Sequence, residues 1–232
     1  MKQFFYESID STNLQAKRLI QQGERDFCVW AKQQTAGRGS RGRSFLSQEG
    51  GLYLSAVLLM KKLETAPTII GAAAAAEAVS RFCGQEVGYK WVNDLILCGK
   101  KIGGVLAEVC GSHIIMGIGV NLNQQHFPAD LEQASSLRLL CSRSFDEEAV
   151  LQALLEQLLK FWQDDAAAFA SYYKRLLSLH RPIFVRSEEE SRPAVALDLE
   201  RSGALRVRYE DNGELALLRS GQVSLRGAEG YL

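Results

Sequence analysis

The sequence has few of the residues that hold disulfide-rich and zinc-binding proteins together. Its five cysteines are odd in number, form no C-x-x-C pair and lie mostly in apolar runs, and its three histidines are scattered without metal-ligand spacing. Unpaired cysteines in apolar runs are typical of a reduced, intracellular protein. We therefore expect a cytoplasmic location, no disulfide framework and no metal site built from protein side chains.

A surplus of charge is also absent, because 27 basic residues balance 27 acidic ones. This balance argues against a global attraction to nucleic acid, although local basic patches remain possible. Long apolar runs are lacking too: the N-terminus has no signal-peptide core, and the stretch at 72–76 is too short to cross a bilayer. We expect neither a DNA partner nor a membrane contact.

What is present is a loop rich in glycine and arginine, with the sequence QTAGRGSRGR at residues 34–43. Glycine lets main-chain N–H groups approach a ligand, and arginine adds fixed charge and forked donors. Apolar runs at 27–31 and 52–60 flank the loop and predict strands. A mobile lid over an anion is the favoured interpretation, and a solvated basic hairpin loop is the plainer alternative.

The glycines of this loop also fit the pattern G-x-G-x-x-G of dinucleotide-binding folds. That fold needs a helix opening at the loop and an acidic residue about 20 positions later. A β-type run follows the loop instead, and the chain contains no G-x-x-x-x-G-K-[ST] motif. If the loop holds phosphate, it does so in another way.

The remaining pattern predicts an α+β fold. Strands are expected at 3–7, at 113–116 and in a hairpin region between 87 and 108, where Asn93 and Asp94 lie at a turn and Gly103 and Gly104 lie in a closely approached strand. Helices are expected at 14–20, 69–82, 150–162 and 164–179. Ser144 and Glu147 match a capping box for the third helix, and His180 is placed at the end of the fourth.

Short alternating runs between turns predict a small all-β barrel of about 45 residues at the C-terminal end. Pro182 and a charged run at 187–192 precede it. We expect a catalytic domain at 1–182 and the barrel at 183–232.

Polar clusters interrupt the apolar pattern at three places. The run at 10–13 offers four polar residues before a helix, whereas a helix cap accounts for only one or two. Lysines and an Asn-Asp pair bracket apolar strands between 90 and 101, and solvated surface is the plainer reading for Lys101 alone. Asn121 follows a glycine-spaced strand, where either a turn or recognition of a base or ribose is consistent with the pattern.

In this order, the segments resemble the biotin protein ligase family, also called biotin-[acetyl-CoA-carboxylase] ligase. The resemblance covers almost the whole chain and rests on six motifs: Asp10-Ser11-Thr12-Asn13, Gln34-Thr35-Ala36-Gly37-Arg38-Gly39, Lys90-Trp91-x-Asn93-Asp94, Lys100-Lys101-Ile102-Gly103-Gly104-Val105, Gly117-Ile118-Gly119-Val120-Asn121 and Ser220-Gly221-Gln222-Val223-Ser224-Leu225-Arg226-Gly227. It implies a mixed β-sheet with packed helices, like the catalytic domain of class II aminoacyl-tRNA synthetases, and an SH3-like C-terminal barrel.

The resemblance also implies a reaction and its partners. ATP with Mg²⁺ converts biotin to biotinoyl-5′-AMP, and a lysine of a biotin carboxyl carrier protein then takes the biotinoyl group. Cations offset the repulsion between the biotin carboxylate and the α-phosphate. A homodimer remains open, since an exposed sheet edge can pair with a second copy.

The resemblance also implies which residues of this chain form the site, because each matches a functional position of the family's motifs. The catalytic residues are Arg38, Lys101 and Asp94. The biotin-binding residues are Ser11, Thr12, Asn13, Gln34, Gly37, Arg38, Gly39, Ser40, Lys101 and Gly104. The nucleotide-binding residues are Arg41, Arg43, Lys90, Trp91, Asn93 and Asn121.

Two positions depart from the family pattern. Ser40 stands where many members have an arginine that helps to retain the adenylate, and Val92 stands where proline is frequent. We hypothesise that the lid relies on Arg41 or Arg43 instead, or that it holds the intermediate more loosely. Unchanged adenylate release in a Ser40→Arg variant would exclude looser retention at this position.

Three other functions are disfavoured. Only ten residues precede Ser11, so we do not expect the DNA-binding helix-turn-helix domain that some relatives carry. Lipoate or octanoate ligases typically have an arginine-rich serine-glycine loop and lack the Ser-Thr-Asn and Gly-Arg-Gly combination. A binding module without catalysis would be expected to lack the cations that Arg38 and Lys101 provide.

Overall fold

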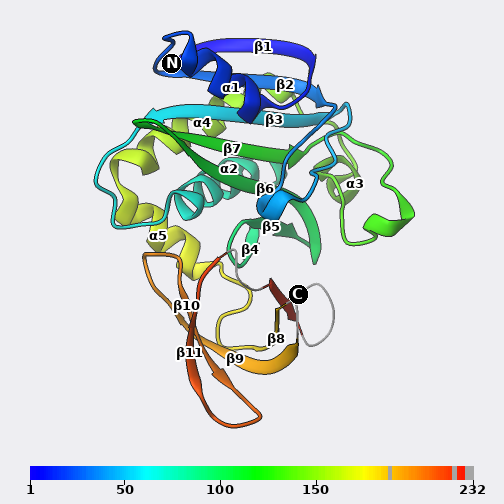
Figure 1. Ribbon diagram of the computed structural model, residues 1–232. Coiled ribbons are helices and arrows are strands. Elements are labelled where there is room, and N and C mark those ends of the chain that lie inside the picture. Colours follow the sequence, from blue (N-terminus) through cyan, green and yellow to red (C-terminus); the bar gives the residue numbers. More distant parts are fainter. Residues whose placement is uncertain (188–189, 221–223, 228–232) are drawn as a thin grey trace.

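The computed structural model describes residues 1–187, 190–220 and 224–227, and its larger part is built on a seven-stranded mixed sheet (Figure 1). The described strands are ordered β1-β2-β3-β7-β6-β5-β4, with β1 and β2 parallel and every other neighbouring pair antiparallel. The bounds are β1 Lys2–Ile9, β2 Phe27–Gln34, β3 Gly51–Leu59, β4 Gly88–Lys90, β5 Asp94–Leu97, β6 Lys100–Cys110 and β7 His113–Asn121.

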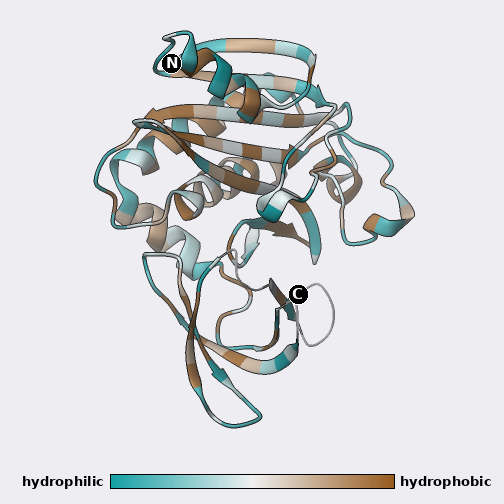
Figure 2. Cartoon of the chain, viewed as in Figure 1, coloured by the Kyte–Doolittle hydropathy of each residue, from teal (hydrophilic) through white to brown (hydrophobic). Residues whose placement is uncertain are grey.

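Helices cover both faces of this sheet. On one face, α1 (Thr12–Gln21) packs on a small core that includes Phe27 and Val29 of β2. On the other face, α2 (Pro67–Cys83) and α4 (Glu147–Gln163) join the large core with Cys28 and Trp30 of the same strand. Alternate residues of a strand point to opposite faces. Because both faces are covered, β3 is buried at eight of its nine positions and reads as a nearly continuous apolar run, visible as brown in Figure 2.

Three short elements and one further helix complete this part of the chain. They are the 3-10 turns η1 (Ser40–Gly42) and η2 (Ala129–Leu131) and the helices α3 (Leu137–Cys141) and α5 (Asp165–Lys174). The η1 turn lies within the connection at 35–50 between β2 and β3, and the turn at 91–93 joins β4 to β5. Both connections reach the same side of the sheet as α1, which places the glycine-arginine loop over β6 and β7.

A second, five-stranded antiparallel sheet follows, in the order β11-β10-β9-β8-β12. Its strands are β8 Pro182–Arg186, β9 Ser191–Leu199, β10 Leu205–Tyr209, β11 Leu215–Leu218 and β12 Ser224–Gly227. It docks on the first sheet through specific contacts: the indole Nε1 of Trp91 donates to the carbonyl of Gly203 over 2.9 Å, and Arg201 pairs with Glu64 and Asp165. In Figure 1 this sheet lies below the larger one.

The α+β class, the large mixed sheet and the separate antiparallel sheet confirm the sequence-based expectation. The strand pattern expected between 87 and 108 is also present, with Asn93 in the first turn. Gly103 lies where an added Cβ would sit 2.5 Å from the carbonyl oxygen of Gly119, which confirms the predicted close approach. Of the closing motif, Gly221-Gln222-Val223 lies outside the described residues.

Two local predictions were wrong. Ser144 and Glu147 do not form a capping box, because Asp146 takes the N-cap of α4 and accepts from the backbone N–H groups of Glu148 and Ala149. The helix expected at 164–179 stops at Lys174, since the chain beyond it pairs with Tyr89 of β4 through two backbone hydrogen bonds of 3.0 Å. His180 therefore lies six residues beyond the helix end.

Candidate active site

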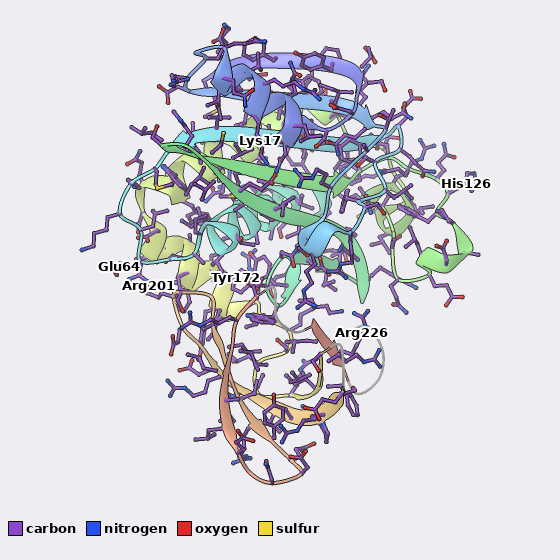
Figure 3. The ribbon with its side chains drawn as sticks, in the orientation of Figure 1. Lys17, Glu64, His126, Tyr172, Arg201 and Arg226 are labelled. Carbon is purple, nitrogen blue, oxygen red and sulfur yellow. The ribbon has the colours of Figure 1, made fainter. Side chains whose placement is uncertain are left out.

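A pocket of about 720 Å³ opens on the α1 side of the large sheet. Its floor comes from β6 and β7, one wall from the start of α1, and its rim from the 35–50 loop and the turn before β5. The second sheet also reaches it through Ser220, Leu225 and Arg226. Arg226, labelled in Figure 3, lies at the junction of the two sheets. Residues distant in sequence thus meet in one cavity.

One end of the pocket is lined by an uncharged, hydrogen-bonded cluster. Ser11, Thr12 and Asn13 are each at most 4% exposed. The amide oxygen of Gln34 accepts from the backbone N–H of Thr12 over 2.8 Å and lies 3.1 Å from its hydroxyl. Ser11 occupies the N-cap position of α1 but makes no side-chain capping bond. Ser11 is therefore not a side-chain cap, and Gln34 instead takes the first backbone N–H of α1.

Two glycines of β7 make room for the residues that shape this end. A Cβ on Gly117 would lie 2.3 Å from Oδ1 of Asn13, and a Cβ on Gly119 would lie 2.6 Å from the ring of Phe45. No side chain fits in those positions without displacing its neighbour. The glycine spacing of this strand lets α1 and the loop approach the sheet.

The glycine-arginine loop is folded into a compact hairpin over the pocket. The backbone of Phe45 donates to the carbonyl of Gly37 over 2.9 Å, and that of Gly39 donates to the carbonyl of Arg43 over 2.7 Å. Ser47 ties the hairpin to the cluster, because its hydroxyl accepts from Nε2 of Gln34 over 2.8 Å. A movement of the loop would therefore shift Gln34 and the hydrogen bonds of the uncharged cluster.

Phe45 is the apolar anchor of this loop. Its ring meets that of Tyr53 edge to face at 6.4 Å and lies over Gly119 of β7. Nζ of Lys101 stands 5.9 Å from the centre of the same ring. The loop is thus fixed to the sheet beside the cationic end of the pocket.

Cationic side chains line the rest of the pocket, and Arg38 is the nearest of them to the uncharged cluster, since it shares the carboxylate of Glu108 with Asn13. Among the described residues, six lysines and arginines line the pocket: Arg38, Arg41, Arg43, Lys90, Lys101 and Arg226. Only two carboxylates, Asp94 and Asp130, accompany them. Nζ of Lys101 lies 2.6 Å from Oδ1 of Asp94. This part of the cavity is therefore suited to an anionic group.

Lys90 is the most deeply buried of these cations, with 3% of its surface exposed. Burial lowers the pKa of its amine to about 7, and the neighbouring charge of Arg226 adds to the effect, while Asp94 opposes it. At neutral pH its charge therefore depends on what else occupies the pocket.

Nearly all of the predicted site residues meet in this pocket. Those that line it are Ser11, Thr12, Asn13, Gln34, Arg38, Gly39, Ser40, Arg41, Arg43, Lys90, Trp91, Asn93, Asp94, Lys101 and Gly104. Gly37 lies behind the lining, where a Cβ would sit 2.3 Å from Ser47 Oγ. Asn121 is buried outside it, donating to the carbonyl of Ser135 over 3.0 Å. The nucleotide role of Asn121 stays a prediction.

Sequence reasoning missed Ser55 and Glu108, which support the cluster from behind. Ser55 Oγ lies 2.5 Å from Oδ1 of Asn13, and Oε2 of Glu108 accepts from Nδ2 of Asn13 over 2.8 Å. Ser55 is a single polar residue within apolar β3, and Glu108 interrupts the apolar second half of β6, so the only available signal was that each breaks an apolar run. Phe45 was missed as well, because an aromatic residue in a loop has no pattern of its own.

No group of three or more acidic, histidine or cysteine side chains is arranged to hold a metal ion in the described part of the chain. In the same residues, no helix is long and apolar enough to cross a membrane.

A model of the biotin/lipoate A/B protein ligase family matches residues 5–122. Among curated proteins, the "Bifunctional ligase/repressor BirA" of Bacillus subtilis is 32% identical over 173 residues, which cover 69% of this chain and 53% of the relative. The "Biotin--[acetyl-CoA-carboxylase] ligase" of Paracoccus denitrificans is 29% identical over 219 residues, covering 86% of this chain and 91% of that protein. The chain spans about half the length of the first of these relatives.

Solved structures are similar over nearly the whole chain. The biotin protein ligase from Aquifex aeolicus, in complex with biotin and ATP, has a TM-score of 0.81 at 27% identity, with 98% of this chain and 99% of that chain covered. The enzyme from Leishmania major, in complex with biotinyl-5-AMP, has a TM-score of 0.68 at 26% identity, with 94% and 99% covered.

Proposed function

Because the chain belongs to the biotin/lipoate A/B protein ligase family, we propose that it is an ATP-dependent biotin protein ligase. It activates biotin as biotinoyl-5′-AMP and transfers the biotinoyl group to a lysine of a biotin carboxyl carrier protein. The similar solved structures that contain biotin with ATP, or biotinyl-5-AMP, support this proposal. So does the relative from Paracoccus denitrificans, which is named as a biotin--[acetyl-CoA-carboxylase] ligase.

The observation that carries the proposal is that one pocket holds both an uncharged, hydrogen-bonding cluster and a set of cations. Biotin has two matching parts, an uncharged ureido ring at one end and a carboxylate at the other. ATP then brings its phosphates to the carboxylate, so the cations belong where the two anions meet.

The ureido ring needs both hydrogen-bond donors and acceptors, which hydroxyl and amide side chains supply. Ser11, Thr12, Asn13 and Gln34 form this end of the pocket, and their burial protects the bonds from competing water. The biotin tail then runs along Arg38-Gly39-Ser40 toward Lys101, with Gly104 leaving room beside it.

In the first step, a carboxylate oxygen of biotin attacks the α-phosphorus of ATP and pyrophosphate leaves. Lys101 and Arg38 stabilise the charge on the carboxylate and phosphate oxygens. Mg²⁺ suits this donor set as a companion of the phosphates, because it is usually held by substrate phosphates and one or two carboxylates. Asp94 and Asp130 are the carboxylates available in the pocket.

In the second step, the amine of the carrier lysine attacks the activated carbonyl carbon and AMP leaves with the electron pair. The amine must lose protons, and we assign Asp94, which lies beside Lys101, as its hydrogen-bond acceptor. Closure of the loop keeps water from hydrolysing the mixed anhydride. The nucleotide is assigned to Arg41, Arg43, Lys90, Trp91 and Asn93.

Arg43 contacts Ser40 within the loop. Its guanidinium donates to the hydroxyl of Ser40 over 3.2 Å and to the carbonyl of Ser40 over 3.3 Å. This contact supports the hypothesis that the lid relies on Arg43. An Arg43→Gln variant should therefore release adenylate faster than the parent, in a stopped-flow chase with unlabelled intermediate. Equal release rates would contradict it.

The finer description of the fold is part of the same proposal. A catalytic domain at 1–182 of the class II synthetase type and an SH3-like barrel at 183–232 agree with the start of the second sheet at Pro182.

Mass spectrometry of an apo biotin carboxyl carrier domain tests the function. With ATP, Mg²⁺ and biotin, the protein should add one biotin to a carrier lysine. Lys101→Ala should slow this transfer by about 10²–10³-fold, the usual cost of losing a charge-stabilising donor. Lys100→Ala is the matched control, because that side chain points away to the carbonyl of Glu132. An unmodified carrier, or modification only when lipoate is supplied in place of biotin, would contradict the proposal.

A further inference from the structure

A single carboxylate, that of Glu108 on β6, is shared by three donors from different parts of the chain. Nδ2 of Asn13 lies 2.8 Å from Oε2, Nζ of Lys17 lies 2.8 Å from Oε1, and Nη1 of Arg38 lies 3.3 Å from Oε1. The side chain is 18% exposed. Lys17, labelled in Figure 3, extends from α1, whereas Arg38 belongs to the loop. Glu108 thus joins helix, loop and sheet.

Glu108 remains ionised in this setting. Burial raises the pKa of its carboxyl, but the hydrogen bonds from Lys17 and Asn13 and the charges of Lys17 and Arg38 outweigh burial, so the pKa is lowered overall. An ionised carboxylate only accepts hydrogen bonds. Whatever faces Glu108 must therefore present a hydrogen-bond donor, and an amide can do so only with its N–H group.

This requirement fixes the orientation of the Asn13 amide. A flipped amide would set its oxygen against the Glu108 carboxylate, two acceptors without a proton between them. With Nδ2 on Glu108, Oδ1 of Asn13 faces Ser55 at 2.5 Å, so the single Ser55 proton points at Asn13. Asn13 then has one N–H left to offer a ligand.

Counting the hydroxyl protons in the same way shows whether Thr12 can donate a hydrogen bond to a ligand. Its hydroxyl lies 2.8 Å from Ser55 Oγ and 3.1 Å from Oε1 of Gln34. The Ser55 proton is already used and the amide oxygen of Gln34 has none, so the Thr12 proton serves one of these two neighbours. Thr12 therefore presents only lone pairs to the pocket. The pocket offers a donor at Asn13 and an acceptor at Thr12, which complements a ligand carbonyl beside a ligand N–H.

We propose that Glu108 is a positioning residue for the biotin site: it sets the donor and acceptor pattern through Asn13 and holds Arg38 at the rim. The inference rests on the proposed function for the identity of the ligand. Through Glu108, the side chain that binds the ureido ring, Asn13, and the loop arginine that meets the biotin carboxylate, Arg38, are held by the same residue. Glu108 touches neither substrate and acts through these two partners.

The test compares Glu108→Gln with two matched variants. Glutamine keeps the shape but can present either an oxygen or an N–H to Asn13, so the amide loses its fixed orientation. Lys17→Met removes the third partner and leaves Asn13 and Arg38 paired. Glu77→Gln makes the same chemical change in an ion pair of α2 with Arg175, 2.7 Å long and remote from the pocket.

Calorimetric titration with biotin, and with 2-iminobiotin, whose cyclic guanidine donates where biotin has its carbonyl, gives the decisive readout. Glu108→Gln should weaken biotin binding at least tenfold and reduce the preference for biotin over 2-iminobiotin at least fivefold. It should also slow single-turnover formation of the adenylate at least tenfold. Lys17→Met and Glu77→Gln should stay within threefold of the parent in each measurement.

Each remaining outcome overturns one proposal. If Lys17→Met reproduces the losses of Glu108→Gln, or if the preference between the two ligands does not change, Glu108 only anchors α1 and the inference is wrong. If the parent itself forms no adenylate from biotin, the proposed function is wrong. If Glu108→Gln proves too unstable to purify, the double variant Lys17→Met/Glu108→Gln replaces it, because it does not leave Lys17 without a counter-charge. The double variant should show the same losses in biotin binding, ligand preference and adenylate formation as those expected for Glu108→Gln.

Discussion

At the scale of single residues, burial decides what the cations of the pocket can do. Lys101 is held by Asp94 at 2.6 Å, whereas Lys90 is buried deeply enough for its pKa to fall to about 7. The first arrangement suits a fixed counter-charge for an anion. The second suits a group that gains its proton when the anion arrives, because a nearby negative charge favours the ammonium form.

Nucleotide binding should therefore take up a proton through Lys90. At pH 8 the free amine is mostly neutral, and a bound phosphate that raises its pKa by one to two units would draw in roughly half a proton or more. Affinity for ATP should fall as pH rises above 7, by up to about tenfold per pH unit. Calorimetry in two buffers of different ionisation enthalpy measures the uptake directly.

Lys90→Met is the control for this measurement, since it removes the titrating amine and keeps the volume. The buffer-dependent part of the heat should disappear in this variant. Identical buffer dependence in the parent and Lys90→Met would mean that Lys90 does not titrate on binding.

The residues that sequence alone predicted, and those it did not, differ in one physical respect. Ser11, Thr12 and Lys101 stand in polar or glycine-rich motifs, where a functional pattern is visible. Ser55 lies inside the buried, apolar β3, and Glu108 lies in the second half of β6, where its neighbours are apolar. A single polar residue there has no partner in the sequence, since its hydrogen bonds go to Asn13, 42 and 95 positions away.

At the scale of elements, the 35–50 loop is held on the sheet by few groups. Phe45 packs on Gly119 and Tyr53, and Arg38 reaches Glu108. Arg41 and Arg43, in and next to η1, are exposed although they line the pocket. Because few apolar contacts fix it, the loop is expected to open at a lower free energy than the sheet beneath it.

Phe45→Ala should make this opening easier. Loss of the partly buried ring should cost about 1–2 kcal/mol of loop closure, which corresponds to roughly 5–30-fold faster trypsin cleavage after Arg38, Arg41 or Arg43. Saturating biotin and ATP should restore protection. Mass spectrometry of the early fragments gives the cleavage sites and rates.

Leu46→Ala is the matched control, because Leu46 is the neighbouring residue of the same loop and is 37% exposed. Its cleavage rate should stay near that of the parent. Equal sensitivity of the two variants would mean that Phe45 does not anchor the loop.

Element boundaries were predicted less well than the elements themselves, and α4 and α5 give the reason. Ser144 and Asp146 both precede α4, and only the tertiary position of the chain selects Asp146 as the cap. Residues after Lys174 have helical character, yet their backbone pairs with β4. Such long-range hydrogen bonds leave no local signal.

At the scale of the whole molecule, both sheets contribute residues to one pocket because a set of polar contacts around Arg201, here called the polar joint, holds them together. Arg201 of the second sheet pairs with Asp165 and Glu64 of the first part, and the backbone of Ala66 donates to the carbonyl of Arg201 over 2.8 Å. Figure 3 labels Arg201 and Glu64 at this joint. The same joint brings Arg226 to the pocket, which sequence periodicity alone could not predict.

Asp165→Asn should loosen this joint in a pH-dependent way. Burial raises the pKa of Asp165, but hydrogen bonds from the backbone of Thr65 and Glu64 and the charge of Arg201 lower it overall. The stabilisation is therefore complete above pH 4, the range of an unfolded aspartate, and is lost as pH falls through the lower folded value. We expect a loss of about 1–2 kcal/mol at pH 7.

Urea titrations at pH 7 and pH 3 measure this difference. The difference in free energy of unfolding between the parent and Asp165→Asn should be present at pH 7 and should be smaller at pH 3. Glu200→Gln, in an exposed pair of 3.6 Å with Arg206, should change stability little at either pH. An Asp165→Asn variant as stable as the parent at pH 7 would contradict the role of this joint.

Oxygen transfer from the substrate acid tests the central claim most directly. In an acyl-adenylate mechanism, one carboxylate oxygen of biotin becomes the bridge to phosphorus and leaves with AMP. Biotin labelled with ¹⁸O in its carboxylate, incubated with the protein, ATP, Mg²⁺ and an apo carrier domain, should therefore yield AMP carrying one ¹⁸O for each biotinylated carrier. Unlabelled AMP, production of ADP and phosphate, or labelled AMP only when ¹⁸O-lipoate replaces biotin would contradict the account.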